Sequence, residues 1–277
     1  QNGMMDKFFD GKLTPMLQTN RGCPFHCTFC TDGIDEKQLV TQFSMERVIS
    51  EINYIGHHSK MRPSTSMLIL ADLNFGMIPR DRKICEALVE TQEKFGFPKK
   101  IDCSTGKNAK DRIIEAIKIL GSSTFMAMSV QSMNQDVLSN IKRDNISSDH
   151  LVALGPTLKN EGLHTMSDVI LGLPGETYET HLQTIKDLVD ADIDWIDVWT
   201  LMLIDGSELN TPQEKEKWGL KTKFRVIPRD FTKLTDGKVV VEIEEVGIGS
   251  NTLSFDEYLE LRLFALILRV TKSGTIF

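Results

Sequence analysis

Two kinds of hydrophobic pattern, one typical of strands and one typical of helices, alternate along residues 15–203. Short apolar runs are followed by stretches in which apolar residues recur every three or four positions, the spacing of one helix face. From about Ser44 to Ile55, for example, Val48, Ile49 and Ile52 share a face with Ile55, and Ser44 is a suitable N-cap. An alternation of this kind is typical of βα units around a parallel sheet.

This alternation predicts six βα-type units. The apolar runs predict strands at 15–19, 66–70, 101–104, 124–130, 164–171 and 195–203. The helical patterns cover 44–55, 80–95, 111–120, a short stretch at 137–141, 148–160 and 178–190. With 277 residues, 40% of them hydrophobic, the chain can bury the core of one large α/β barrel with an appendage.

The pattern changes after Asp205. Residues 213–223 are polar and charged, 239–246 predict a strand, and 254–270 predict a helix capped by Ser254, with the apolar residues around Phe264 in the core. We therefore expect a linker over 1–12, a barrel over 13–210 and a C-terminal α+β appendage over 211–277. Basic residues crowd the stretch 215–233, where a solvated face is favoured over a site for an anionic substrate or phosphate.

Charge and cysteine count limit the functional class. A formal net charge of −7 argues against a protein that grips nucleic acid through a basic field. No apolar run approaches the ~20 residues of a membrane span, and the longest, 263–268, predicts a buried helix. Five cysteines, an odd number, do not suggest a disulfide scaffold, so we expect a cytoplasmic setting. The isolated Cys85 and Cys103 are expected to be buried structural thiols. Because the chain starts at Gln1, we expect it to be part of a longer protein.

The other cysteines, Cys23, Cys27 and Cys30, form a C-x3-C-x2-C motif after the first predicted strand. Thiolates suit iron–sulfur clusters, zinc and copper(I). Three thiolates leave one iron of a four-iron cluster open to a small-molecule ligand. A structural zinc site with His26 as the fourth ligand is the weaker alternative, because His26 lies between two of the ligands. A redox pair of Cys23 and Cys27 lacks the C-x-x-C spacing of thioredoxin-like sites.

The segment RGCPFHCTFC resembles the signature of the radical S-adenosylmethionine (SAM) superfamily, C-x3-C-x-aromatic-C, with Phe29 as the aromatic residue. The resemblance covers about residues 13–210, through SVQSMNQDVLSNIKR and DVILGLPGET, and implies the family's partial (β/α)6 TIM-type barrel. It also implies that the three thiolates hold a 4Fe–4S cluster whose fourth iron is chelated by SAM. An electron from an external donor would then cleave SAM to a deoxyadenosyl radical, which abstracts hydrogen from the substrate.

The same resemblance implies a set of SAM contacts at the carboxyl ends of the strands, where barrel active sites lie. One departure from the family is Ala71-Asp72, which stands in place of Gly-Gly-Glu after the second strand. The implied contacts are Asp72 and Asn74 with the amino group, Arg143 with the carboxylate, Gln131 and Ser132 with the ribose, and Ile170 and Leu203 with the adenine, together with Ser104 at the third strand end and Phe29 in the cysteine loop.

Together the motifs resemble most the cobalamin-binding branch of the superfamily. This resemblance implies a cobalamin-binding domain upstream of this chain and methyl transfer to an unactivated carbon. The expected partners are a small-molecule substrate and the electron donor, with no membrane and no nucleic acid. Two alternatives stay open. An RNA-modifying methylthiotransferase would need a basic and aromatic RNA-binding surface. A non-catalytic electron-transfer module would want four cysteine ligands and no SAM pocket.

Overall fold

The computed structural model describes residues 3–61, 66–106, 110–144, 158–160 and 162–271. Their packing divides the chain into two compact units. Unit 1 comprises residues 1–23, 39–129 and 149–166, and unit 2 comprises 24–38, 130–148 and 167–277. The chain therefore passes from one unit to the other directly after Cys23. This division does not test the boundaries predicted after residues 12 and 210, which stay predictions.

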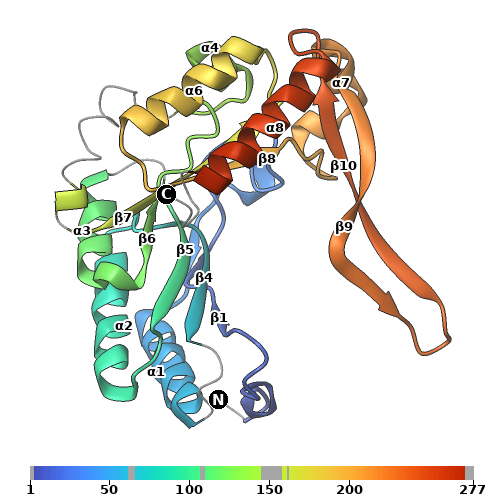
Figure 1. Ribbon diagram of the computed structural model, residues 1–277. Coiled ribbons are helices and arrows are strands. Elements are labelled where there is room, and N and C mark those ends of the chain that lie inside the picture. The colour runs from blue at the N-terminus through green and yellow to red at the C-terminus, as the bar shows by residue number, and fades with distance from the viewer. Residues whose placement is uncertain (1–2, 62–65, 107–109, 145–157, 161, 272–277) are drawn as a thin grey trace. The chain divides into compact units, whose positions relative to one another are not determined.

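Unit 1 is built on a parallel sheet in which β1 (Met16–Leu17), β4 (Met67–Phe75) and β5 (Lys100–Thr105) lie in that order. Helices α1 (Met45–Met61), α2 (Asp81–Phe95) and α3 (Lys110–Leu120) lie side by side next to it (Figure 1). Sheet and helices share one core, which includes Val48, Ile52, Leu68, Leu70, Ile84, Leu88, Cys85 and Cys103. The predicted burial of the two isolated thiols is confirmed, and burial raises the pKa of Cys103 to about 11.

Two short strands bracket the loop that carries the cysteines. β2 (Asn20–Arg21) pairs antiparallel with β3 (Thr41–Gln42), so the two ends of the loop lie together. The 3-10 helix η1 (Asp6–Phe8) precedes this region in the sequence, and the 3-10 helix η2 (Asp35–Lys37) lies within the loop. Of the strand predicted over 15–19, only residues 16–17 form a strand, β1, and β2 begins directly after the predicted end.

Helix α1 begins where the sequence predicts, after Ser44, whose hydroxyl accepts a hydrogen bond from the backbone N–H of Arg47 at 3.3 Å. The helix continues to Met61, beyond the predicted end. Val48 is buried, whereas Ile49 is 37% exposed, so the predicted place of Ile49 on the buried face is wrong. The buried stripe follows the i, i+4, i+7 spacing from Val48, and Ile49 lies at its margin.

The ends of β4 and β6 both depart from regular pairing. β4 pairs regularly with β5 as far as Leu70, its predicted end, and the ladder resumes only at Phe75 opposite Thr105. The intervening residues 71–74 form a bulge. β6 (Phe125–Ala127) stops short of the predicted 124–130, and the next pairing is Gln131 with Val169. Between the pairs Ala127–Met166 and Gln131–Val169, the segment after β6 has one residue more than β7, and Gln131 adopts a φ of 65°. Bulges of this kind re-aim side chains at the end of a strand.

β7 (His164–Leu171) matches its prediction and is shared by the two units. Residues 164–166 pair with β6 in unit 1. The remainder lies beside β8 (Trp195–Thr200) in unit 2. Unit 2 also contains α4 (Gln135–Asn140) and α6 (Tyr178–Asp190), both close to their predicted positions. The strand predicted to end at residue 203 ends at Thr200, because Leu203 donates its N–H to the carbonyl of Glu245 in the C-terminal hairpin.

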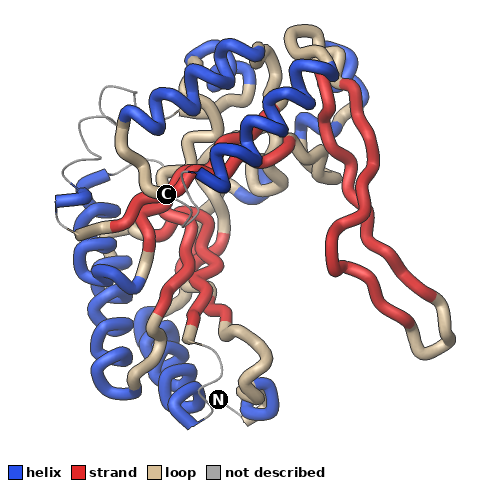
Figure 2. The backbone as a smooth tube through the Cα atoms, in the orientation of Figure 1, coloured by secondary structure: helices blue, strands red, loops and turns tan. Residues whose placement is uncertain are grey.

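The C-terminal part of unit 2 contains a β-hairpin and two helices. The elements are η4 (Glu208–Asn210), α7 (Pro212–Trp218), β9 (Lys221–Lys233), β10 (Val239–Gly249) and α8 (Phe255–Thr271). Figure 2 shows the hairpin as a long pair of strands that projects from the rest of unit 2. β9 is not predicted by the sequence pattern, because its apolar residues alternate with lysine and arginine within the basic stretch.

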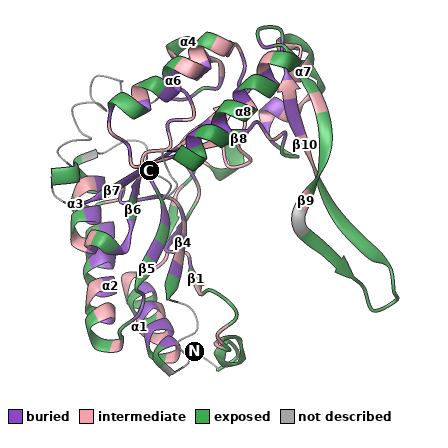
Figure 3. Cartoon of the chain, in the orientation of Figure 1, coloured by how far each residue is buried: buried purple, intermediate pink, exposed green. Residues whose placement is uncertain are grey.

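The exposure of side chains in this C-terminal part of unit 2 agrees with one prediction and corrects another. Figure 3 shows the hairpin as mostly exposed, which agrees with a solvated basic stretch. The predicted burial of 263–268 is wrong for part of the helix. α8 buries Leu261 and Leu268, but Leu263 is 60% exposed and Phe264 is 38% exposed. A helix that is apolar all round gives no sequence signal for which face is covered.

The α/β class predicted from the alternation is confirmed. Five of the six predicted strand regions have a described strand at nearly the expected position, and of the first only residues 16–17 form a strand. The helix predicted over 148–160 lies outside the described residues except for 158–160. Within the described part of the chain, no helix is both long enough and apolar enough to cross a membrane.

Candidate functional site

Asp72 fastens the bulge at the end of β4 to the segment that precedes the cysteine motif. Its buried carboxylate accepts hydrogen bonds from the backbone N–H groups of Thr19 (2.6 Å) and Asn20 (3.2 Å). It also accepts from the Asn20 side-chain amide at 2.9 Å and from the Thr19 hydroxyl. Charge-assisted bonds of this kind are among the stronger ones in proteins. Asp72 is therefore committed to positioning residues 19 and 20, and its predicted contact with an amino group stays a prediction.

Asn74 lies two residues farther along β4 and contacts the first cysteine. Its side-chain nitrogen is 3.3 Å from Cys23 Sγ, and both residues are buried. Its oxygen, Oδ1, is also buried and has no hydrogen-bond partner among the described residues. Buried acceptors are normally satisfied, so this one indicates a missing donor. Unit 1 therefore brings Asn74 and Cys23 together, as the sequence predicts for two residues of one site.

In unit 2 the loop that carries Cys27 and Cys30 is held by its backbone. The N–H of Thr28 donates to the carbonyl of Ile141 at 3.2 Å, and its carbonyl accepts from the N–H of Leu209 at 2.8 Å. A tight turn follows, in which the N–H of Cys30 donates to the carbonyl of Cys27 at 3.1 Å. The loop is thus anchored between the end of α4 and η4.

Gly33 ends this turn, and the sequence analysis predicted no role for it. A Cβ atom at this position would lie 2.3 Å from the carbonyl oxygen of Cys27, which no side chain can tolerate without movement of the backbone. The T-D-G sequence after Cys30 is an ordinary turn signal, and only the close approach of the Cys27 backbone reveals its importance.

N–H groups also lie near the sulfurs of Cys27 and Cys30. Arg143, which is 5% exposed, places Nη1 3.9 Å from Cys27 Sγ. The backbone N–H of Asp32 is 3.4 Å from Cys30 Sγ. An N–H donor therefore lies beside each of these two sulfurs, as is common at the ligand sulfurs of iron–sulfur clusters. Arg143 follows the end of α4, where its own N–H donates to the carbonyl of Leu138 at 2.9 Å.

The predicted adenine contacts belong to one apolar cluster of unit 2. Leu203 is part of its buried core, and Phe29 and Ile170 pack against it. These three side chains, separated by up to 174 positions, therefore lie in one place, and their contacts with SAM stay a prediction. The other members are Val137, Leu138, Ile141, Leu173, Leu201, Leu209, Trp218 and Leu220.

Gln131 and Ser132 occupy the bulge opposite β7. The N–H of Gln131 donates to the carbonyl of Asp168 at 2.9 Å, and its carbonyl accepts from Ile170 at 3.0 Å. Its side-chain Oε1 is buried without a partner among the described residues. The hydroxyl of Ser132 accepts from the N–H of Asn134, near the start of α4. Gln131 thus offers a second buried acceptor, while Ser132 is engaged in shaping the turn.

Ser104 is the predicted residue with the least support from the structure. It lies on β5 with its side chain exposed, and no hydrogen bond of its hydroxyl is described. The adjacent Thr105 points to the other face, where its hydroxyl donates to the carbonyl of Ala127. The predicted contact of Ser104 with SAM stays a prediction.

A buried contact between a carboxylate and a histidine after β7 escaped the sequence analysis. Glu176, the last residue of the GLPGE segment, accepts the N–H of Gly172 at 2.6 Å and contacts His181 Nδ1 at 3.0 Å. Both side chains are almost completely buried. The pair closes the turn that follows Ile170 and Leu171. A glycine-proline turn alone does not predict it, because the partner histidine belongs to the next helix.

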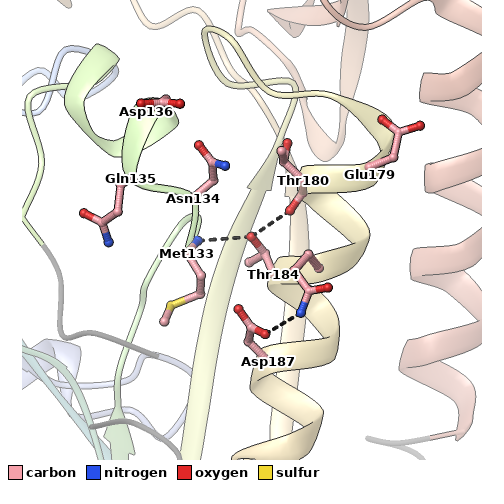
Figure 4. A pocket seen from close by; sticks show the side chains of 9 residues that line it. Met133, Asn134, Gln135, Asp136, Glu179, Thr180, Thr184 and Asp187 are labelled. Carbon is pink, nitrogen blue, oxygen red and sulfur yellow. Dashed lines mark hydrogen bonds between the residues drawn. The ribbon is translucent and has the colours of Figure 1, made fainter. Parts of the chain in front are cut away.

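Unit 2 also has two hollows on its surface. One, shown in Figure 4, lies between the start of α4 and helix α6, where Thr184 accepts the N–H of Met133. It contains none of the predicted site residues. The other is lined in part by His26, Lys142 and Arg143 and therefore adjoins the cysteine loop. His26 lies in this lining and is not one of the N–H donors described above beside the three sulfurs.

The donor set fits an iron–sulfur cluster in its chemistry. In the described part of the chain, no three His, Cys, Asp or Glu side chains are grouped as ligands of one metal ion, so convergence of the three thiols stays a prediction. All three are free cysteines, and each sulfur has an N–H donor within 4 Å. Hydrogen bonds to sulfur are a recurrent feature of such clusters. Within its own unit, each of the buried, unpartnered acceptors Asn74 Oδ1 and Gln131 Oε1 suits an N–H or O–H group of a ligand.

Comparison with known proteins identifies a single family. The Radical SAM superfamily matches residues 17–188. The chain is 34% identical over 211 residues to the cobalamin-dependent radical SAM methyltransferase TokK of Streptomyces tokunonensis, covering 75% of this chain and 30% of that protein. It is 30% identical over 257 residues to the 2-(S-pantetheinyl)-carbapenam-3-carboxylate methyltransferase of Streptantibioticus cattleyicolor, covering 91% and 36%. The chain thus spans about a third of the length of these relatives.

Solved structures show the same fold. The methyltransferase TsrM of Kitasatospora setae, with tryptophan substrate and a SAM analogue bound, superposes with a TM-score of 0.67 at 13% identity, covering 95% of this chain and 53% of that one. Coproporphyrinogen III oxidase of Escherichia coli gives a TM-score of 0.51 at 16% identity, covering 73% and 49%. At these identities the likeness establishes the fold and leaves the reaction open.

Proposed function

Because the chain belongs to the radical SAM superfamily, an enzyme family that uses a 4Fe–4S cluster and SAM, we propose that Cys23, Cys27 and Cys30 hold such a cluster and that SAM is cleaved there. The observation that carries this proposal is the placement of an N–H donor beside each of the three sulfurs. Bound at this site, the cluster supplies the electron that splits SAM into methionine and a deoxyadenosyl radical.

The protein's own residues would bind and orient SAM. In unit 1, Asn74 Oδ1 is a buried acceptor suited to the ammonium group. In unit 2, Gln131 Oε1 is suited to a ribose hydroxyl, and Arg143 places a positive charge beside Cys27, as a carboxylate requires. Phe29, Ile170 and Leu203 belong to the apolar cluster against which adenine would pack and from which water would be excluded. Ser132 would act indirectly, because its hydroxyl accepts the N–H of Asn134 and stabilises the turn that follows Gln131.

The cluster assignment is tested by anaerobic reconstitution with iron and sulfide. Iron content and the electron paramagnetic resonance (EPR) spectrum of the reduced protein are measured with and without SAM. We expect about four irons per chain, as a 4Fe–4S cluster requires, and a spectrum that changes when SAM is added. Cys85→Ala is the matched control, because this thiol lies in the core of unit 1. Normal iron content and an unchanged SAM response in Cys27→Ala would contradict the assignment.

For the full-length protein we propose cobalamin-dependent methyl transfer to a carbon atom of a small-molecule substrate. The support is similarity to two methyltransferases, one of them named as cobalamin-dependent, of which this chain spans about a third. Cobalamin would then be held by residues outside this chain, and the electron would come from an external donor. The test is whether the full-length protein binds hydroxocobalamin and transfers a labelled methyl group from SAM. A cluster that forms but never cleaves SAM would favour the electron-transfer alternative.

A further inference from the structure

We propose that the side-chain amide of Asn74 raises the reduction potential of the cluster by donating a hydrogen bond to the sulfur of Cys23. This inference rests on the proposed function, since it takes Cys23 as a cluster ligand. Asn74 Nδ2 lies 3.3 Å from Cys23 Sγ, within hydrogen-bonding range for sulfur. Each residue is at least nine-tenths buried, at 7% exposure, so water does not compete for the contact.

The orientation of the amide follows from its chemistry. An asparagine amide has two N–H donors on nitrogen and only acceptor capacity on oxygen, whereas a metal-bound thiolate is an acceptor without a proton. The nitrogen must therefore face Cys23 once the thiolate is formed. The oxygen then points elsewhere, and it has no partner among the described residues. The side chain of Asn74 thus donates to the sulfur through its nitrogen and offers a buried acceptor through its oxygen.

The contact is held in place by neighbouring structure. Asp72 lies two positions earlier on β4 and binds Thr19 and Asn20 through four hydrogen bonds. Those two residues lie four and three positions before Cys23. Because the same bulge carries both Asp72 and Asn74, its attachment to residues 19 and 20 also fixes the approach of Asn74 to Cys23. The amide is preorganised, so little entropy is lost when the hydrogen bond forms.

Hydrogen bonds to sulfur change the energy of the two redox states by different amounts. Reduction adds one negative charge to the cluster and its thiolates, and an N–H donor stabilises this added charge. The effect is larger in a buried site because the effective dielectric constant is low. Removal of the donor therefore shifts the reduction potential to a more negative value and makes the first electron harder to deliver.

Asn74 is the side chain best suited to test this effect. The donor beside Cys30 is the backbone N–H of Asp32, which only a proline substitution removes, and proline would also restrict the backbone. Arg143 lies farther from its sulfur, 3.9 Å from Cys27, and carries a full charge that complicates interpretation. Asn74→Leu removes the N–H groups, keeps a similar size and adds no charge. Asn74→Asp keeps the shape and replaces the N–H donors with a carboxylate oxygen.

The test is an EPR-monitored redox titration of the anaerobically reconstituted chain. We expect Asn74→Leu to shift the midpoint potential to a more negative value and Asn74→Asp to shift it further, with wild-type iron content. Thr105→Val is the matched control, because it removes a buried hydroxyl at the end of the adjacent strand that bonds Ala127 and no cysteine. Its potential should equal that of the wild type. An unchanged potential in loaded Asn74→Leu, or an equal shift in Thr105→Val, would overturn the inference.

A measurement on the unmodified protein keeps the inference testable if the variants do not load a cluster. With asparagine labelled with ¹⁵N, electron–nuclear double resonance of the reduced cluster should detect one coupled asparagine nitrogen. A wild-type cluster without any such coupling contradicts the role of Asn74 while leaving the cluster intact. Failure of the wild-type chain to form a cluster would instead contradict the proposed function.

Discussion

Asp81 is a buried carboxylate at the start of α2 that organises the loop after β4. Its Oδ2 accepts the N–H groups of Gly76 at 2.9 Å and Ile78 at 3.1 Å, whereas Oδ1 is buried without a partner among the described residues. Burial raises the pKa of Asp81 from 3.8 to about 6. Between pH 4 and 6 the folded chain therefore keeps a proton that the unfolded chain has lost, and its stability falls as pH rises through this window.

Replacement of Asp81 with asparagine removes this titration. The free energy of unfolding of Asp81→Asn, relative to that of the wild type, should rise by about 2 kcal/mol between pH 4 and pH 7, since one pKa unit corresponds to about 1.4 kcal/mol and part of the titration lies outside this interval. The two values are obtained from urea denaturation at each pH. The pH dependence is the diagnostic quantity, because any lost hydrogen bond adds a constant offset. A difference between the two proteins that is the same at both pH values would refute the assignment.

Gly33 is the second residue whose substitution gives a clear expectation. In Gly33→Ala the new Cβ would lie 2.3 Å from the Cys27 carbonyl, so the turn that presents Cys27 and Cys30 must open. We expect lower iron content after reconstitution.

Gly56→Ala is the matched control for Gly33→Ala, because its Cβ meets Thr91 Cγ2 at 2.4 Å on α2, within unit 1. That change should lower stability by about 1–3 kcal/mol through overpacking and leave iron content unaffected below the unfolding temperature. If the two variants lose iron equally, the effect of Gly33 is one of general stability.

At the scale of elements, helix α8 has one apolar face that is buried and another that is exposed. Leu261 is fully buried against the rest of unit 2, whereas Leu263 is 60% exposed. Leu261→Ala should lower the free energy of unfolding by about 2–5 kcal/mol, the cost of a core cavity. Leu263→Ala should change it by less than about 0.5 kcal/mol. Urea denaturation of the two variants measures both values, and equal losses would show that α8 packs on both faces in solution.

The elements that the sequence predicts best are those with a local pattern. β7, α2 and α6 have the expected bounds within a residue, because their hydrophobic period is regular and their ends carry turn or capping residues. β9 was missed because Phe224 and Val226 alternate with lysine and arginine, a pattern that equally describes an exposed charged loop. Its strand character depends on pairing with β10, which no local window contains.

The same distinction applies to the site, where a motif of neighbouring residues was predicted but contacts between residues far apart in the sequence were not. The three cysteines lie within eight positions, so their spacing alone indicates a cluster motif. The partnership of Asp72 with Thr19 spans 53 positions, and it assigns Asp72 a structural role that the sequence did not suggest. Asn74 was predicted as a residue near SAM, but its bond to Cys23 follows only from the bulge in β4. The contact of Glu176 with His181 Nδ1 likewise follows only from the folded turn.

For the whole molecule, the central claim is that this chain cleaves SAM at a cluster held by Cys23, Cys27 and Cys30. The most direct measurement is deoxyadenosine formation by the anaerobically reconstituted chain, supplied with SAM and dithionite and followed by liquid chromatography. The wild type and Cys85→Ala should form deoxyadenosine, and alanine variants of each of the three motif cysteines should form none. Undiminished deoxyadenosine formation by Cys27→Ala would contradict the account.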